Sequence, residues 1–276
     1  MISNTSESAG KASAASARKR RMLITLSYDG TAYAGWQRQE NAMTIQQKVE
    51  EALRRLTGEH VGVNGASRTD AGVHALGQCA HFDTASCIVP RRYPLALNAC
   101  LPRDIRVVAC REVADGFHAR FNAKGKRYTY RIHNASHASA LHRHLCAHVP
   151  QPLDVCRMQA CLPALLGTND FAAFQAAGGT SKTTMRTIRE ATLSQKGEAI
   201  TFTICGNSFL YNMVRIIAGT LVDVGLHKLN GNPFEDAFHT GNRLLLGSTA
   251  PARGLELTEV IYTELEQKRI LAEDGE

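Results

Sequence analysis

The chain lacks any long hydrophobic run. No stretch approaches the roughly 20 apolar residues that a membrane-spanning helix needs. The best candidate, FLYNMVRIIAGTLVDVG, contains Arg215 and Asp223. With 44% hydrophobic and 21% charged residues, the composition is that of an average globular chain. We therefore expect a soluble protein that buries a large core and does not associate with membranes.

Common cofactor and catalytic motifs are also missing. The sequence contains no GxxxxGK[ST] phosphate loop, no strand-linked GxGxxG, no HExxH and no GxSxG. Its eight cysteines include no CxxC pair, and there is no secretion signal, so we expect reduced and mostly buried thiols. These absences favour a redox-neutral, metal-free reaction over ATP or nicotinamide chemistry.

One cluster of potential metal ligands stands in LHRHLCAHV. His142, His144, Cys146 and His148 occupy alternate positions, which on a strand would share one face. Metal binding would need these ligands to converge at set distances. We favour a plain basic, partly solvated segment over a metal site.

Acidic residues are absent between Gly116 and Leu153, a span with six Lys or Arg and six His. Within it, FHARFNAKGKRYTYRIH alternates bases with aromatic residues. Cations that follow phosphates and rings that stack on bases are typical of single-stranded nucleic-acid binding. The alternative is a solvated basic strand whose aromatic side chains point into the core. We favour nucleic acid as the partner.

A second acid-free stretch, FAAFQAAGGTSKTTMRTIR, covers residues 171–189. It places Lys182, Arg186 and Arg189 around a Gly-Gly pair. This pattern is compatible with a loop that closes on a phosphate backbone, although flexible basic loops are common without that role.

The first 21 residues, MISNTSESAGKASAASARKRR, hold five bases and one acid, Glu7, a net +4 of the formal +7 for the chain. Few acids and many small residues loosely suggest an organelle transit peptide, but we favour a disordered basic tail. Because the tail carries much of the charge, the overall pI is a weak indicator of nucleic-acid binding.

The hydrophobic pattern predicts alternating strands and helices. Thr44 and Gln47 form a capping-box pattern before IQQKVEEALRRL, and Gly58 suits a helix C-cap. Strands mixed with helices, and pairs of strands close in sequence, indicate an α+β fold with a largely antiparallel sheet. The expected strands are 22–28, 60–66, 76–84, 105–113, 126–133, 187–195, 199–205 and 257–263, and the expected helices are 45–56, 93–100, 154–166, 209–225 and 233–246.

GASRTDAGVHA, residues 65–75, admits two interpretations. A carboxylate at Asp70 between small neighbours is open to a ligand, and Arg68 would keep it ionised, so Asp70 could act as a nucleophile or base. Alternatively, Thr69 to Gly72 form only a turn, in which Asp70 bonds its own backbone and Gly72 takes a positive φ. Spacing alone favours the turn.

Arg215 is flanked by apolar residues in sequence. On a helix, however, Asn212, Arg215, Gly219 and Asp223 form one polar stripe. This stripe could face solvent. If it faces a cleft instead, Arg215 needs an anionic partner, because an unpaired buried charge is strongly unfavourable, and Asp70 could supply it.

Six segments in order resemble the tRNA pseudouridine synthase A family, over nearly the whole chain from Met22 to about Tyr262. One RTDAGVHA segment alone is suggestive, and six are highly specific. The segments are YDGTAYAGWQ (28–37), GASRTDAGVHALGQ (65–78), FHARFNAKGKRYTYRI (117–132), GTNDFAAF (167–174), NSFLYNMVRIIAGTLVDVG (207–225) and GLELTEV (254–260).

The resemblance implies isomerisation of uridine to pseudouridine in the anticodon stem-loop of tRNA, at positions 38–40, without metal, nucleotide or redox cofactor. Asp70 matches the family's essential aspartate and Tyr128 the tyrosine that stacks on the target base. Arg215 matches the basic residue that pairs with the aspartate. Arg68 matches an arginine that holds the flipped nucleotide, and Leu255 matches an apolar residue of the base pocket.

The resemblance also implies two α+β halves that share a central sheet, here 22–115 and 116–265, followed by a tail at 266–276. It further implies a cytoplasmic homodimer with tRNA spanning both subunits. Two alternatives stay open: an RNA-binding protein that lost catalysis, and an Asp-nucleophile hydrolase of small phosphates. The hydrolase hypothesis would need a metal-ligating carboxylate cluster, which the sequence lacks. It also does not explain the basic aromatic span.

Overall fold

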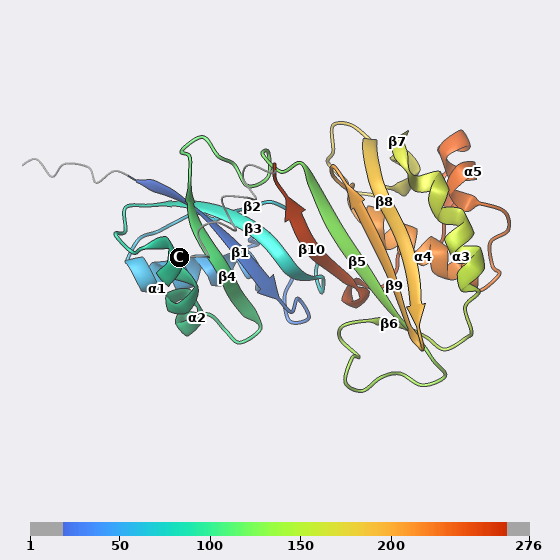
Figure 1. The fold of residues 1–276 in the computed structure, drawn as a ribbon, viewed down its shortest axis with the longest axis horizontal. Helices are drawn as coiled ribbons and strands as arrows, with labels where there is room; N and C mark the ends of the chain where they lie inside the picture. The colour runs from blue at the N-terminus through green and yellow to red at the C-terminus, as the bar shows by residue number, and fades with distance from the viewer. Residues whose placement is uncertain (1–18, 264–276) are drawn as a thin grey trace, which may run out of the picture.

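Ten strands form a single sheet in the computed structural model, which describes residues 19–263 (Figure 1). The main path is β4-β1-β3-β10-β5-β9-β8-β7, with β2 beside β3 and β6 beside β5. Only the β10–β3 and β5–β6 pairs are parallel. The predicted α+β fold with a largely antiparallel sheet is confirmed. The strands are β1 (Arg20–Tyr28), β2 (Asn64–Gly65), β3 (His74–Thr84), β4 (Ile105–Val113), β5 (Gly125–Asn134), β6 (Ala147–Val149), β7 (Gly167–Asp170), β8 (Met185–Lys196), β9 (Ala199–Gly206) and β10 (Leu255–Ile261).

Helices gather at the two ends of this sheet. In Figure 1, α1 and α2 lie with β1 and β4 at one end, and α3, α4 and α5 lie with β7, β8 and β9 at the other. Short 3-10 turns fill several connections, including Leu162–Leu165 and Ala252–Gly254. The helices are α1 (Ile45–Thr57), α2 (Tyr93–Cys100), α3 (Val155–Cys161), α4 (Met213–Gly225) and α5 (Pro233–Thr240).

The last strand, β10, joins the two ends. It pairs with β3 only at Glu256 and Leu257, opposite His74 and Ala75. Its pairing with β5 is longer and begins with Leu255 opposite Tyr130. The parts of the sheet built from the first and second halves of the chain therefore meet at β10.

The capping pattern predicted for α1 is confirmed at Thr44 and Gly58 but not at the Gln47 side chain. The Thr44 hydroxyl accepts a hydrogen bond from the Gln47 amide at 3.4 Å, and Gly58 ends the helix with φ 74°. The Gln47 side chain turns away from Thr44 and donates to Glu51. Only the first half of the capping box is thus formed.

Three predicted helices are shorter than expected. The helix predicted over 209–225 begins at Met213 because Asn212 has φ 58°, which is incompatible with a right-handed helix. The helix predicted over 233–246 ends at Thr240, where Gly241 takes φ 67°. The helix predicted over 154–166 changes to a 3-10 turn at Leu162, since Pro163 has no N–H for an α-helical bond.

The strand predictions need two corrections. Of the strand expected over 60–66, only Asn64–Gly65 pairs, with β3. The short strands β6 and β7 were not predicted from the hydrophobic pattern.

The segment expected to be a disordered tail is ordered at its end. Arg20 and Arg21 are the first residues of β1. Arg20 pairs with Glu112 at 3.2 Å and Arg21 with Asp83 at 2.7 Å. The rest of that segment up to residue 18, and the predicted tail at 266–276, lie outside the described residues.

Two sequence-based expectations concern the whole chain. All eight cysteines are free thiols, but only Cys79, Cys146, Cys161 and Cys205 are buried, so the expectation that most are buried is not met. Within residues 19–263, no helix has both the length and the apolar character to span a membrane.

Candidate functional site

A cavity of about 750 Å³ lies beside the junction at β10. Its walls come from the loop between β2 and β3, the segment leading into β5, residues 178–181, and the start of α4. Segments far apart in sequence therefore meet there. All five residues predicted for the site line it, namely Arg68, Asp70, Tyr128, Arg215 and Leu255.

Asp70 begins a tight turn before β3. Its carbonyl accepts a hydrogen bond from the Val73 amide at 3.1 Å, and Gly72 takes φ 75°. The predicted turn is therefore real, shifted by one residue to 70–73. The Asp70 carboxylate makes no bond to its own backbone and points toward Arg215. The two interpretations of this segment are compatible: the turn exposes the carboxylate to the cavity.

The loop that carries Asp70 is held by the segment YDGTAYAGW. The Tyr28 hydroxyl bonds to the Thr69 hydroxyl at 2.8 Å, and the Trp36 amide donates to the Thr69 carbonyl at 3.0 Å. A side chain at Gly35 would place its Cβ 2.4 Å from that carbonyl, so only glycine allows this approach. These contacts fix the backbone position of Asp70.

Arg215 reaches the same point from the first turn of α4. Its guanidinium lies 3.5 Å from Asp70 Oδ2, and it donates to Asn212 Oδ1 and to the Ala250 carbonyl, both at 2.8 Å. Gly219 belongs to the polar stripe predicted for this helix, and a Cβ at Gly219 would lie 1.8 Å from the Ser248 carbonyl. The stripe therefore faces the interior.

The surroundings of Asp70 change its ionisation. Burial raises the pKa of the Asp70 carboxyl, and the charge and N–H of Arg215 oppose this shift without cancelling it. Its side chain is 26% exposed. The cation predicted to keep Asp70 ionised was Arg68, but Arg215 has this position, while Arg68 is exposed on the cavity wall.

Tyr128 projects from β5 into the cavity wall. Its hydroxyl shares a hydrogen bond of 2.8 Å with Ser67, and Phe209 meets its ring edge-on at a centroid distance of 5.1 Å. Burial raises the pKa of Tyr128 to about 12, so the phenol is neutral at physiological pH. Sequence reasoning missed Ser67 and Phe209, both within the resembling segments.

Leu255 is the first residue of β10 and is 6% exposed. It adds an apolar surface to the cavity.

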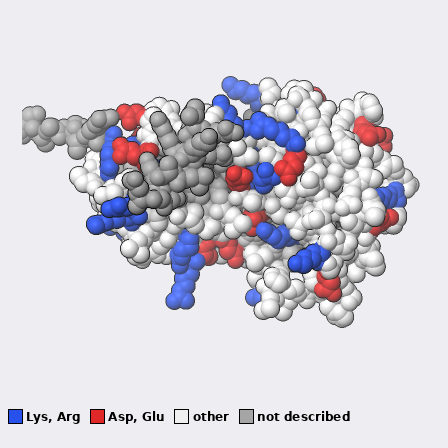
Figure 2. Space-filling model, viewed as in Figure 1, with Lys and Arg blue, Asp and Glu red and all other residues white. Residues whose placement is uncertain are grey.

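The basic aromatic span separates into different environments. Phe117 and Tyr130 are buried in the core, as the alternative interpretation supposed, whereas Tyr128 lines the cavity and Phe121 is 74% exposed there. On the face of the molecule seen in Figure 2, Lys and Arg lie close to Asp and Glu. Among the described residues that line the cavity, by contrast, the charges are Asp70 and four cations: Arg68, Arg120, Lys126 and Arg215.

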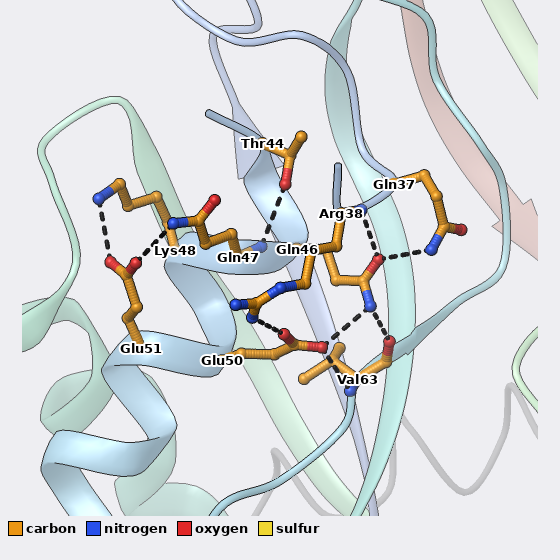
Figure 3. A network of polar contacts seen from close by, with 9 residues as sticks. All are labelled: Gln37, Arg38, Thr44, Gln46, Gln47, Lys48, Glu50, Glu51 and Val63. Atoms are coloured by element: carbon orange, nitrogen blue, oxygen red, sulfur yellow. Dashed lines mark hydrogen bonds and ion pairs between the residues drawn. The ribbon is translucent and has the colours of Figure 1, made fainter. Parts of the chain in front are cut away.

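A polar network supports the cavity rim at the start of α1 (Figure 3). Gln46 donates to Glu50 and to the Val63 carbonyl, and it accepts from the Gln37 side chain at 3.0 Å. Arg38 pairs with Glu50 at 2.8 Å. Because Gln37 and Gln46 also line the cavity, the network links its wall to the helix.

The possible metal ligands in LHRHLCAHV do not converge. His142 and His144 lie in an exposed turn, and His148 Nε2 contacts the Ala135 carbonyl at 2.8 Å. Within the described part of the chain, no group of three or more His, Cys, Asp or Glu side chains is placed to hold a metal ion.

Comparison with known proteins identifies the family. A family model described as tRNA pseudouridine synthase matches residues 24–122 and 162–263. The tRNA pseudouridine synthase A of Acetivibrio thermocellus is 48% identical over 243 residues, which cover 88% of this chain and all of that protein. That of Bacillus licheniformis is 44% identical over 244 residues, 88% of this chain and 99% of that protein.

Four of the five predicted site residues fall inside the ranges matched by the family model, and Tyr128 falls between them. The match also includes both segments that bring Asp70 and Arg215 together. The chain belongs to the tRNA pseudouridine synthase family.

Proposed function

We propose that the protein isomerises uridine to pseudouridine in the anticodon stem-loop of tRNA, at positions 38–40, with Asp70 as the catalytic carboxylate. One observation carries the assignment: Asp70 is the single carboxylate among the described residues that line a cavity with four cations. A polyanionic substrate is attracted to such a cavity, and a held carboxylate at its floor can react.

Asp70 starts cleavage of the glycosidic C–N bond by acting on the sugar. The freed uracil rotates and rejoins the sugar through C5, which then loses its proton. Arg215 holds the carboxylate in place and offsets its burial, so that it remains available as an anion.

The other residues hold the flipped nucleotide. A base inside a stem must leave the stack before it can react, and the enzyme replaces the lost stacking with its own side chains. Tyr128 stacks on the uracil, Leu255 lines the base pocket, and Arg68 holds the nucleotide at the exposed wall. The support for this assignment is that all three line the same cavity as Asp70.

We also propose a cytoplasmic homodimer in which tRNA spans both subunits. Each subunit comprises two α+β halves, 22–115 and 116–265. The junction at β10 supports this division, since it separates strands of the first half from those of the second.

The test is Asp70→Asn, which removes the charge and keeps the shape. The variant should fold and bind tRNA but release no tritium from tRNA labelled at C5 of uridine. Asp83→Asn is the matched control, because Asp83 lies on β3 in an ion pair with Arg21, outside the cavity. Tritium release by Asp70→Asn near the wild-type rate would disprove the role of Asp70.

A further inference from the structure

Lys126 on β5 lines the cavity and Arg186 lies on β8, and neither has an acidic partner among the described residues. We propose that Lys126 and Arg186, together with Arg120, form an anion site that binds one phosphodiester of the RNA strand next to the flipped nucleotide. The inference rests on the proposed function, since it names how that substrate is held. It concerns binding, separately from the chemistry at Asp70.

The register of three strands places both side chains on one face of the sheet. Lys126 is opposite Gly206 on β9, and Gly206 is opposite Ile188 on β8. Directly paired residues point to the same face, and so do residues two apart on one strand. Arg186 therefore shares the face of Lys126. Tyr128 also has this face and lines the cavity.

Gly206 lets neighbouring side chains pack closely over the strand between the two cations. A Cβ at this position would lie 2.7 Å from Ile188 Cδ1, 2.9 Å from the Thr187 carbonyl and 3.3 Å from Phe209 Cζ. The apolar side chains of Ile188 and Phe209 therefore cover the backbone here, and neither offers a polar group to Lys126 or Arg186.

Neither cation is neutralised by a described residue. Arg186 is 8% exposed, and its donors reach only the Met185 carbonyl at 2.6 Å and the Thr183 hydroxyl at 3.4 Å. Its buried Nε has no hydrogen-bond partner. The Lys126 side chain is half-buried and has no hydrogen-bond or ion-pair partner within residues 19–263. Buried, unpaired charges are unfavourable, so the arrangement calls for an anion.

The charged groups that shift the pKa of Lys126 are also cations. Burial, then Arg120 and Arg186, lower the pKa of Lys126 to about 8. Burial lowers the pKa of Arg186 as well. An anion bound among the three cations would relieve their mutual repulsion. A phosphodiester offers two oxygens that share its negative charge, and guanidinium groups bind such oxygens with matched geometry.

The position of Arg120 indicates a phosphate that belongs to a nucleic-acid strand. Its guanidinium lies 5.8 Å from the ring centre of Phe121, and both residues line the cavity. Phe121 is exposed and its ring lies beside that of His118. An exposed ring next to a cation cluster is the combination that holds a base and its phosphate together.

The experiment replaces one phosphate charge at a time. Anticodon stem-loop RNAs carry a single neutral methylphosphonate linkage, at each position around the target uridine in turn, and binding to the full chain is measured. For the wild type, one linkage should weaken binding by about 10-fold or more, since it loses charge-assisted hydrogen bonds. In Lys126→Met this penalty should fall to within about 2-fold.

Two variants serve as controls. Lys124→Met removes an exposed lysine of the same acid-free span that does not line the cavity, and it should retain the full penalty. Lys126→Arg should restore it. Lys126→Met should also reduce the slope of log affinity against log salt by about 0.7 to 0.9, the value for one phosphate contact. Arg186→Lys, checked by thermal melting, tests the second cation without removing a buried charge.

Three outcomes would overturn the proposal. One is equal sensitivity at every linkage. Another is a penalty that persists unchanged in Lys126→Met. The last is a site for free anions only. In that case inorganic phosphate binds to the wild type and not to Lys126→Met, but no single methylphosphonate linkage weakens RNA binding. Failure of the proposed function would look different, because the wild type would then form no pseudouridine whatever the linkage results.

Discussion

The two faces of β5 carry basic side chains in contrasting surroundings. On one face, Arg127 pairs with Glu190 and with Glu259, and Arg131 pairs with Glu256 at 2.8 Å. On the other face, Lys126 lines the cavity and forms no ion pair with any residue in the described part of the chain. Neighbouring strands supply the acids that the acid-free sequence lacks. The number of Lys and Arg residues in a segment therefore indicates RNA binding less well than whether neighbouring strands place carboxylates beside them.

The largest effect is expected at Arg215, the cation that does have an acidic partner beside the cavity. Arg215→Gln leaves Asp70 half-buried without an opposing charge. The turnover rate should fall by about 10- to 100-fold, the range for removing a partner from a charged group. Single-turnover kinetics on tRNA transcript measure this loss.

The pH dependence of the reaction rate shows why Arg215→Gln is slow. Arg215 lowers the pKa of Asp70, so without it this pKa rises further above the ordinary range, and the acidic limb of the rate profile should move to higher pH. Arg215→Lys should move it less. An unshifted limb in Arg215→Gln would contradict the ion pair.

A smaller effect is expected at Tyr128, the aromatic residue of the cavity face. Tyr128→Leu removes the stacking surface, so kcat/KM should fall by about 10-fold or more, as for loss of one base–aromatic contact. Tyr128→Phe keeps the ring and loses only the hydroxyl bond to Ser67, and it should retain activity within about 5-fold. Equal losses in the two variants would show that the hydroxyl, and not the ring, is the important group.

Lys126→Met should make the folded protein more stable at neutral pH while weakening its RNA binding. The pKa of Lys126 is about 8 in the folded protein and about 10.4 in an unfolded chain. Below pH 8 the lysine is therefore charged in both states, and the folded state bears the cost of burying it beside Arg120 and Arg186. Thermal melting should show a higher Tm for Lys126→Met at pH 7, and the difference should shrink as pH rises from 8 toward 10. A lower Tm at pH 7 would show that this charge stabilises the fold.

The smallest effect is expected on the paired face. Arg127→Met removes two partly exposed ion pairs, and such pairs contribute about 1 kcal/mol or less each. Stability in urea should fall slightly, and less so in high salt. The salt dependence of tRNA binding should not change. A slope reduced as much as in Lys126→Met would remove the distinction between the two faces.

Sequence patterns predicted those helices and strands whose ends are determined by neighbouring residues. The helix at 45–57 was found because Thr44 and Gly58 act on their immediate neighbours. The start of α4 was missed because Asn212 adopts a left-handed conformation, which nothing in the flanking residues requires. Pairing at β6 and β7 depends on strands elsewhere in the chain, which hydrophobic periodicity does not report.

The candidate site shows the same division. The resemblance marked Asp70 and Arg215, and the helical stripe explained why Arg215 would need a partner. Their contact spans 145 positions in the chain and depends on how α4 meets the loop before β3. The nearness of Lys126 to Arg186 follows from the register through Gly206, which no local pattern contains. Sequence reasoning therefore supplied candidates, and the sheet decided which cations have partners.

The position of β10 has a consequence for the order of assembly. This strand is the last to be synthesised of those described, yet it lies between β3 and β5 and begins with Leu255 in the cavity wall. Chains fold from the N-terminus as they are made, so earlier strands can pair before β10 exists. The cavity is then completed only once synthesis has reached β10, and a chain cut short before Leu255 has no complete site with which to engage RNA.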